Sequence, residues 1–269
     1  DPRTRQEASH VCPEVGNDLE DGVPVLIPLN EVQWKPVHFL ELPDETFEYE
    51  FDLPVPLADW DVFACWERAR FHSMRDNLNQ GDVLFDVGTE QGWCNLIYAT
   101  FVGPENMVLV EPTKKFWPNI AATWDRNYDS GPLAVYNGLL SDTSNDSLPV
   151  FEPWPAVSAG PLIDRNKYQY IHSHDSDIRQ LTLDDLVELS GVVPNAITID
   201  VEGAELRVLH GATDTLLEHR PIVWASVHPD LIERDYNATA DEVHTFMESL
   251  GYQPVFLAKD HEEHWMYQP

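Results

Sequence analysis

The stretch VLFDVGTEQGW, residues 83–93, is the segment that predicts the fold. Its apolar residues suit a buried strand, and Asp86 follows at the carboxyl end, where doubly wound sheets bind ligands. Gly88 and Gly92 then permit a sharp turn and a close approach of the backbone to a ligand before a helix begins. The alternative is that the two glycines serve only the turn. The segment therefore predicts a strand, a turn and a helix, with a ligand site at the turn.

The spacing of this turn indicates which ligand it suits. The pattern is D-x-G-x-x-x-G, whereas dinucleotide-binding folds carry G-x-G-x-x-G and pack a pyrophosphate on the helix N-terminus. Here Glu90 lies at the helix start and would repel a phosphate. We therefore expect an uncharged or cationic nucleoside and not NAD, which argues against the competing class of NAD-linked dehydrogenases. The predicted cofactor contacts in this segment are Asp86, Gly88, Thr89, Glu90, Gln91 and Gly92.

Outward from this segment, predicted strands alternate with predicted helices, which is typical of a parallel sheet with crossover helices. The predicted strands are 82–87, 106–111, 133–140, 196–201 and 221–228, and the predicted helices are 92–101, 113–127, 183–189, 203–217 and 239–249. Residues 252–258 and 265–268 form a predicted hairpin. The predicted fold class is therefore α/β and Rossmann-like: a doubly wound, mostly parallel, seven-stranded sheet with an antiparallel C-terminal strand.

The chain divides into a variable N-terminal arm, residues 1–58, and a main domain, residues 59–269. The arm is rich in proline and acidic residues and predicts one hairpin over residues 38–53. A helix is predicted from Asp59 to Leu78, with Asp59 as its N-cap. Residues 143–180 are an insertion that is too long for an ordinary loop.

Charge and composition exclude several classes of partner. Lys and Arg number 16 against 47 Asp and Glu, which gives a net charge of −31 and a surface that repels nucleic-acid phosphates. No apolar run reaches about 18 residues, so we expect no membrane span. The sequence shows no apolar leader, and Cys12, Cys65 and Cys94 lack metal-type spacing, so we expect reduced thiols in a cytoplasmic protein. A homo-oligomer is compatible with the sequence.

Acidic residues also end the second and third predicted strands. Glu111, with Pro112 beside it, lies at the tip of the second strand, where an acid can accept hydrogen bonds from both hydroxyls of a ribose. Each such charge-assisted bond contributes about 1.5–3 kcal/mol. The alternative is a solvated strand-end carboxylate. Ser141 and Asp142 follow the third strand and could reach an adenine edge, or could instead form a turn or a cap.

The stretch AITIDVEGAE, residues 196–205, carries three carboxylates behind an apolar run. Unpaired carboxylates are costly to desolvate, so they need a reason. Asp200 and Glu202 alternate past the strand end and point to one side of the sheet edge. We interpret them as orienting the cofactor amine or the acceptor, or as part of a divalent-metal site with His228. Glu205 falls on the first turn of the next helix, where its charge complements the helix dipole.

With these motifs in place, the chain resembles the FkbM family of S-adenosylmethionine-dependent methyltransferases over about residues 80–230. The matching motifs, in the family's order, are FDVGTEQGW (85–93), VLVEP (108–112), LLSD (139–142), LTLDDL (181–186), ITIDVEGAELRVLHGA (197–212) and RPIVWASVH (220–228). The resemblance implies a class I methyltransferase fold and S-adenosylmethionine bound against Asp86, Gly88 and Glu111. It also implies methyl transfer to oxygen, often of a sugar or natural-product hydroxyl.

The chain departs from the family pattern near its predicted catalytic residues. Thr198 stands where the family often has Lys, and Ser226 and His228 occupy a stretch where Glu is usual. Methyl transfer is a direct displacement in which alignment contributes about 7–11 kcal/mol. A base adds about 10²–10⁴-fold when the acceptor is a hydroxyl. We predict His228 as this base, with Asp200 or Glu202 as alternatives; His228 could instead be a cap before Pro229.

The predicted function is therefore S-adenosylmethionine-dependent O-methylation of a small molecule or glycan, with a divalent metal as an open question. The alternative is a non-catalytic accessory protein that binds S-adenosylmethionine or another nucleoside. We expect the arm and the insertion to form the acceptor pocket. Within the insertion, IHSHDSD, residues 171–177, is interpreted as a polar hairpin or loop and not as a metal cluster.

Overall fold

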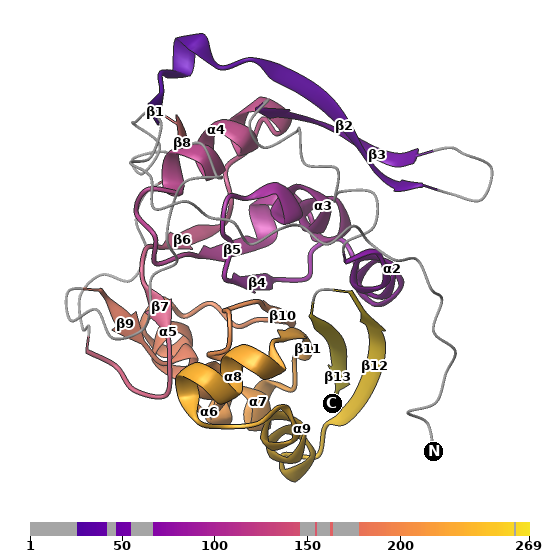
Figure 1. Cartoon of the computed structure of the whole chain (residues 1–269), viewed down its shortest axis with the longest axis vertical. Helices are drawn as coiled ribbons and strands as arrows, with labels where there is room; N and C mark the ends of the chain where they lie inside the picture. The colour runs from indigo at the N-terminus through magenta and orange to yellow at the C-terminus, as the bar shows by residue number, and fades with distance from the viewer. Residues whose placement is uncertain are drawn as a thin grey trace.

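The computed structural model describes residues 26–41, 47–54, 67–145, 154, 162–163, 178–260 and 262–269. Its centre is a seven-stranded sheet (Figure 1). In spatial order the strands are β12 (Gln253–Lys259), β13 (Glu263–Gln268), β11 (Ile222–Val227), β10 (Ala196–Ile199), β4 (Leu84–Val87), β5 (Met107–Val110) and β6 (Ala134–Tyr136).

The strand directions confirm the predicted fold class. Strands β11, β10, β4, β5 and β6 pair in parallel, which accounts for the five strands expected to alternate with helices. Strand β13 is antiparallel to both β11 and β12. The C-terminal strand is thus inserted between its hairpin partner and the parallel strands, and its amino end lies beside the carboxyl end of β11.

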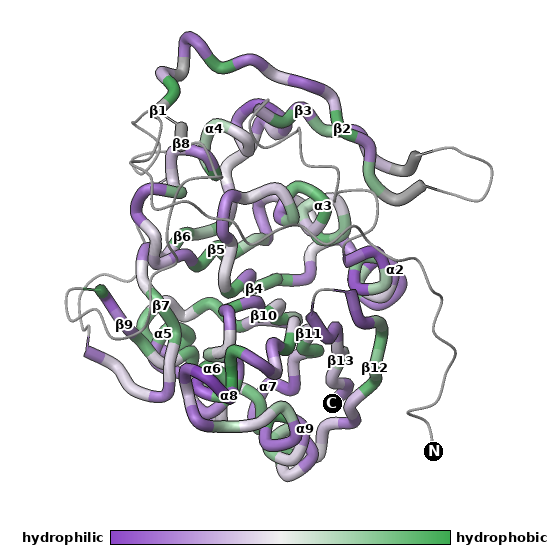
Figure 2. The backbone as a smooth tube through the Cα atoms, in the orientation of Figure 1, coloured by the Kyte–Doolittle hydropathy of each residue, from purple (hydrophilic) through white to green (hydrophobic). Residues whose placement is uncertain are grey.

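Both faces of the sheet are covered, because neighbouring residues of its strands are buried on opposite sides. Leu84 belongs to one apolar cluster and Phe85 to the other. Figure 2 shows the apolar character of these inner strands. The helices that contribute to the first cluster are α2 (Arg68–Asn77), α3 (Trp93–Val102) and α4 (Trp117–Asn127). Those that contribute to the second are α5 (Leu183–Ser190), α6 (Glu205–His210), α7 (Thr213–His219), α8 (Pro229–Tyr236) and α9 (Ala240–Ser249).

The N-terminal arm contains the predicted hairpin, formed by antiparallel strands β2 (Trp34–Glu41) and β3 (Phe47–Pro54). The hairpin packs on the main domain: the ring of Phe39 stacks on that of Trp93 at 5.9 Å. The backbone N–H of Asp52 donates to Asn127 Oδ1 at 2.8 Å, and Asn127 Nδ2 donates to the Asp52 carbonyl at 2.9 Å. This part of the arm therefore belongs to the core.

The arm and the insertion also meet each other. Strand β1 (Leu26–Ile27) pairs antiparallel with β8 (Leu162–Ile163). The described residues also include the 3-10 helices Leu29–Glu31 and Pro104–Asn106. The remaining predictions in these regions fall outside the described residues: the helix start at Asp59, the segment 171–177, and Cys12 and Cys65.

Two predicted elements are each split in two, which corrects the sequence analysis. The strand predicted over 133–140 ends at Tyr136; Leu139–Leu140 forms β7, which pairs in parallel with β9 (Gln180–Leu181) in a separate sheet. The helix predicted over 203–217 breaks into α6 and α7 near Gly211. A Cβ at Gly211 would lie 2.0 Å from the Ser141 carbonyl oxygen, so the chain packs too closely there for a continuous helix with side chains.

Helix α8 was absent from the prediction. It begins directly after β11, with Pro229 in its first turn, and only Ile232 is buried among its residues. A single buried residue leaves little periodic signal in the sequence. Among the described residues, no helix has the length and apolar character needed to cross a membrane, as expected.

Candidate functional site

The turn after β4 is shaped by the packing of the chain on itself. Gly88 has φ +94°, and a Cβ there would lie 1.8 Å from the Asp200 carbonyl oxygen, which follows β10. Gly92 has φ +85°, and a Cβ there would lie 3.1 Å from the Cα of Ile120 in α4. L side chains rarely adopt such backbone angles. The glycines are thus required by the turn and its neighbours, the alternative that the sequence left open; their contact with a cofactor stays a prediction.

Asp86 is buried at the end of β4 and holds the turn together. Its Oδ2 atom accepts hydrogen bonds from Thr89 Oγ1 at 3.0 Å and from Asn95 Nδ2. Burial raises the pKa of Asp86 to about 6, although these hydrogen bonds favour the charged form. A carboxylate is therefore in place at the first strand tip, but its observed partners are groups of the chain itself.

Glu111 is buried directly after β5, on the neighbouring strand. Its Oε2 accepts from the backbone N–H of Glu90 at 2.9 Å, and its Oε1 accepts from that of Thr113 at 2.7 Å. Burial raises the pKa of Glu111 to about 7, against a hydrogen bond from the Thr113 side chain and the two backbone bonds. A carboxylate has about four lone-pair sites, so Glu111 retains the capacity to accept from a ligand. A ribose hydroxyl is a donor that fits this remaining capacity.

The other predicted cofactor residues are engaged within the chain. Gln91 is buried and its Oε1 accepts from Asn119 Nδ2 at 2.7 Å. Asp142 Oδ1 pairs with Arg207 Nη2 at 2.8 Å, and despite partial desolvation this pairing lowers the pKa of Asp142. Ser141 donates its backbone N–H to Leu181. Ser141 and Asp142 are thus held by residues distant in the sequence, and their contact with an adenine stays a prediction.

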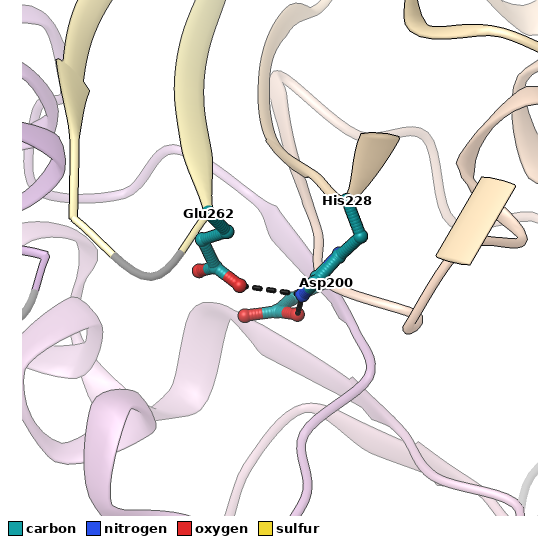
Figure 3. Close-up of side chains that lie close together, drawn as sticks. All are labelled: Asp200, His228 and Glu262. Atoms are coloured by element: carbon teal, nitrogen blue, oxygen red, sulfur yellow. Dashed lines mark ion pairs between the residues drawn. The ribbon is translucent and has the colours of Figure 1, made fainter. Parts of the chain in front are cut away.

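His228 lies at the centre of a cluster of carboxylates at the carboxyl edge of the sheet. Its Nδ1 is 2.8 Å from Glu205 Oε1, and its Nε2 is 2.5 Å from Glu262 Oε2. Figure 3 shows the Glu262 and Asp200 carboxylates on the same side of the ring. The Nε2 atom also lies 3.8 Å from Asp200 Oδ1 and 3.7 Å from Glu202 Oε2. The structure thus brings together all three predicted catalytic residues and adds two further carboxylates.

The structure corrects the roles predicted for Glu205 and the alternative for His228. Glu205 begins α6 as predicted, but its side chain is fully buried and accepts from the Gly203 N–H at 3.0 Å while contacting His228. It therefore does more than complement a helix dipole. His228 occupies the N-cap position of α8 without a side-chain capping bond, so the interpretation of this histidine as a cap is wrong.

The carboxylates control the charge of His228. Burial opposes the imidazolium, but hydrogen bonds to Glu205 and Glu262 outweigh it and raise the pKa of His228 well above its ordinary value. Burial, reinforced by Glu262, raises the pKa of Asp200 well above its usual range. Burial also raises the pKa of Glu202, whose side chain is 43% exposed. In this arrangement His228 donates to carboxylates through both nitrogens and has no lone pair with which to act as a base.

Arg70 is a functional candidate that the sequence analysis missed. It is buried, its Nη1 donates to Ser226 Oγ at 2.6 Å, and the same atom lies 3.7 Å from Asp200 Oδ2. Its Nη2 pairs with Glu67. Asp200, for which the sequence offered no basic partner, therefore has one from α2, more than a hundred positions away in the chain.

Glu262 is the second missed residue, and here a signal existed. It lies in the turn between β12 and β13, within the acidic and histidine-rich stretch KDHEEH, residues 259–264. Because β13 is antiparallel to β11, with Glu263 opposite Val227, this turn is delivered to the end of β11 and to His228. The predicted antiparallel hairpin thus contained the information that places Glu262, although no motif did.

A further set of ligand-type side chains, Asp260, Glu262 and His264, occupies the same turn. His264 is fully buried; its Nε2 lies 3.0 Å from Asp260 Oδ2 and its Nδ1 lies 3.3 Å from Ser226 Oγ. Both ring nitrogens are thus used within the chain. Through His264, this set holds the hydroxyl of Ser226, which in turn accepts a hydrogen bond from Arg70.

A parallel sheet with acidic side chains gathered at its carboxyl edge defines an α/β protein of the Rossmann-like type. Residues 86–254 match the model of the methyltransferase FkbM domain. The chain therefore belongs to the FkbM methyltransferase family, and the resemblance predicted from its motifs is confirmed.

Individual relatives match the chain more distantly. It is 32% identical over 143 residues to the hexuronic acid methyltransferase AglP of Haloferax volcanii, an alignment that covers 52% of this chain and 54% of the relative. The chain thus spans about half the length of this curated relative. The FkbM methyltransferase structure from Methylobacillus flagellatus KT is 18% identical, covers 72% of this chain and 44% of its own, and has a TM-score of 0.48. Fibrillarin from Aeropyrum pernix is 11% identical, with coverages of 88% and 100% and a TM-score of 0.43.

Proposed function

We propose that this protein transfers the methyl group of S-adenosylmethionine to a hydroxyl group of a glycan that contains a hexuronic acid. The observation that carries the proposal is the pair of buried carboxylates, Asp86 and Glu111, at the tips of adjacent parallel strands within the family-matched region. Glu111 retains acceptor capacity for a ribose hydroxyl. The structure places Glu90 in the turn before α3 and not at the helix start, but its charge next to the predicted cofactor site still disfavours a pyrophosphate, and with it NAD.

The support for the acceptor comes from the relative AglP, whose name describes a hexuronic acid methyltransferase. We propose that the acceptor approaches the sheet edge near Asp200, Glu202 and His228. The arm 1–58 and the insertion 143–180 would then form the acceptor side of the site, beside a methyltransferase domain at 59–269. The pairing of β1 with β8, which joins the two segments, supports this division of roles.

Among the three catalytic candidates, Glu202 suits the role of proton acceptor best. His228 donates to Glu205 and Glu262, so it is a poor base in this arrangement. Glu202 is the more exposed of the two remaining carboxylates, and its raised pKa makes it a better base than an ordinary glutamate. It is also held at φ +53°, a conformation that is uncommon for a residue with a side chain. Asp200 is the alternative acceptor.

The proposal is tested first by calorimetry and then by methyl transfer. We expect S-adenosylmethionine to bind and NADH not to bind; the reverse result would reject the proposal. Labelled S-adenosylmethionine should then modify oligosaccharides that contain hexuronic acid, detected by mass spectrometry as the gain of one CH₂ group. Matched oligosaccharides with neutral hexoses in the same positions are the control for the acceptor.

A non-catalytic accessory protein that binds S-adenosylmethionine is the second candidate. The observation in its favour is that both nitrogens of His228 are occupied by carboxylates. Binding of S-adenosylmethionine without transfer to any acceptor, including an extract of the source organism, would favour this candidate. A cytoplasmic location and a homo-oligomeric state remain proposals, to be tested by fractionation and by sedimentation.

A further inference from the structure

We propose that Asp200, His228 and Glu262 form a binding site for a divalent cation of the Mg²⁺ or Mn²⁺ type. The site deepens the proposed function, because the cation would hold the anionic acceptor next to the methyl donor. The sequence alone suggested Asp200, Glu202 and His228 as ligands. The structure replaces Glu202 by Glu262, which the C-terminal hairpin brings to the ring of His228.

The distances within this set match those between the ligands of one cation. One ligand atom from each residue lies within 4.8 Å of the others. Ligands held about 2.1 Å from a cation lie about 3.0 Å apart at right angles and about 4.2 Å apart in line. The observed separations from His228 Nε2, 2.5 Å to Glu262 Oε2 and 3.8 Å to Asp200 Oδ1, fall close to this range. Side-chain adjustments of less than about 1 Å would therefore suffice to place a cation between the three atoms.

Glu205 prepares His228 for this role. Its fully buried carboxylate lies 2.8 Å from Nδ1, on the side of the ring away from Asp200 and Glu262. A carboxylate on the far nitrogen of a metal-binding histidine fixes the ring orientation and leaves the other nitrogen with its lone pair toward the metal. The imidazole is thus held with Nε2 directed at the proposed cation, whose binding would release the proton that Nε2 shares with Glu262 in the metal-free protein.

The charges around His228 independently indicate a missing cation. Four carboxylates surround it: Asp200, Glu202, Glu205 and Glu262. The neighbouring cationic side chain, Arg70, is shared between Glu67 and Asp200, so it does not balance the other three carboxylates. Within the described residues, Oε2 of the fully buried Glu205 has no hydrogen-bond partner. Buried charges are normally paired or bound to a metal, so this cluster contains fewer cations and donors than its carboxylates require.

The ligand types and the proposed acceptor narrow the identity of the cation. One imidazole with two carboxylates is an oxygen-rich set, which suits Mn²⁺ or Mg²⁺ better than copper or zinc with their preference for nitrogen and sulfur. A hexuronic acid carries a carboxylate of its own, which the cluster would repel without a cation. A divalent cation would bridge the two and would also acidify a bound hydroxyl, which assists removal of its proton by Glu202.

Binding of Mn²⁺ alone tests the site without reference to activity. The full-length protein, freed of metal by a chelator, is titrated with Mn²⁺ and the free ion is followed by electron paramagnetic resonance. We expect one bound Mn²⁺ per chain, with hyperfine coupling to a nitrogen that disappears in His228→Asn. Glu262→Gln and Asp200→Asn should each weaken binding about tenfold or more. Glu263→Gln, a half-buried neighbour in the same hairpin that pairs with Lys259, is the matched control and should bind as the wild type does.

The outcomes separate the cation site from the proposed function. Absence of bound Mn²⁺ overturns the site. Binding that Glu262→Gln and Asp200→Asn leave unchanged in folded protein also overturns it, and identifies an adventitious ion only. Thermal melts establish that each variant is folded. Binding of S-adenosylmethionine is measured separately, on the same protein in chelator. If S-adenosylmethionine does not bind but Mn²⁺ does, the proposed function alone is refuted. If S-adenosylmethionine binds but Mn²⁺ does not, the cation site alone is refuted.

Discussion

The buried carboxylate of Glu111 leads to a prediction about pH. With a pKa of about 7, about nine-tenths of these groups are ionised near pH 8 and about one-tenth near pH 6. If the ionised carboxylate accepts a hydrogen bond from the ribose, the dissociation constant for S-adenosylmethionine rises about tenfold as the pH falls from about 8 to about 6. Glu111→Gln removes the charge and should weaken binding near pH 8 by about 10–150-fold, the equivalent of about 1.5–3 kcal/mol.

The contribution of Glu111 to the free energy of unfolding should fall as pH rises, whereas the affinity for S-adenosylmethionine should increase. A carboxyl group whose pKa is raised by folding contributes stability that is full below its unfolded pKa and is lost as pH rises through its folded pKa. For Glu111 the range runs from the ordinary value of 4.5 to about 7, which corresponds to about 3 kcal/mol as an upper limit. Asp86 acts in the same sense over a lower range, from 3.8 to about 6. The difference between wild type and Glu111→Gln isolates the contribution of Glu111.

Isothermal titration calorimetry across this pH range measures the affinity, and chemical denaturation of the unliganded protein measures the stability. Glu105→Gln, an exposed acid just before the same strand, is the control and should follow the wild type in both assays. The reasoning fails if the affinity of Glu111→Gln keeps the wild-type pH dependence. It also fails if affinity in the wild type is flat between about pH 6 and pH 8, since an ionised carboxylate could not then be the group that the ligand contacts.

Three further predictions concern the turn and the catalytic candidates. Glu202→Gln should lower turnover by about 10²–10⁴-fold, with the dissociation constant for S-adenosylmethionine within about twofold of wild type; single-turnover assays measure this, and unchanged turnover excludes Glu202 as the base. His228→Ala should leave cofactor affinity nearly intact and lower turnover about tenfold or more, and normal turnover would remove His228 from the site. Gly88→Ala should destabilise the fold by about 3 kcal/mol or more, because its Cβ would lie 1.8 Å from a backbone oxygen of Asp200. Gly81→Ala is the matched control, because Gly81 shares φ +94° but a Cβ there would meet nothing within 4 Å. Denaturation of this variant should show only the conformational cost of about 1–2 kcal/mol. Equal losses of stability in the two variants would refute the packing argument.

The sheet could be predicted because its signals are local. Strands β4, β5, β10 and β11 are short apolar runs that end in polar residues, and the first three are followed by a helical period. The errors occurred where distant packing overrides local pattern. Gly138 and Gly211 lie at the two breaks: a Cβ at Gly138 would lie 2.6 Å from the ring of Tyr136, and a Cβ at Gly211 would lie 2.0 Å from the Ser141 carbonyl oxygen. The collision at Gly211 is not visible in the sequence, because Ser141 is distant along the chain and becomes its neighbour only on folding.

The candidate site was predicted in part for the same reason. Asp86, Glu111, Asp200 and Glu202 end their strands, and parallel strands bring their carboxyl ends to one edge. Their partners follow no motif: Arg70 reaches Asp200 from a helix outside the alternating pattern. The sequence therefore indicated where acids gather and left open how their charge is balanced. That balance decides the chemistry, since it determines whether the histidine in the cluster is a base, a charged donor or a ligand.

The C-terminal hairpin connects the topology of the sheet to this charge balance. In a sheet of parallel strands, only the loops after the strands meet the carboxyl edge, whereas the antiparallel β13 contributes the residues before it. Glu262 enters the site by this route, and it lies beyond the family match, which ends at residue 254. Motifs within the matched region could not point to it, but the pairing of Glu263 with Val227 requires it to lie near His228. The proposed cation site thus depends on a residue that the strand order places and the family pattern does not.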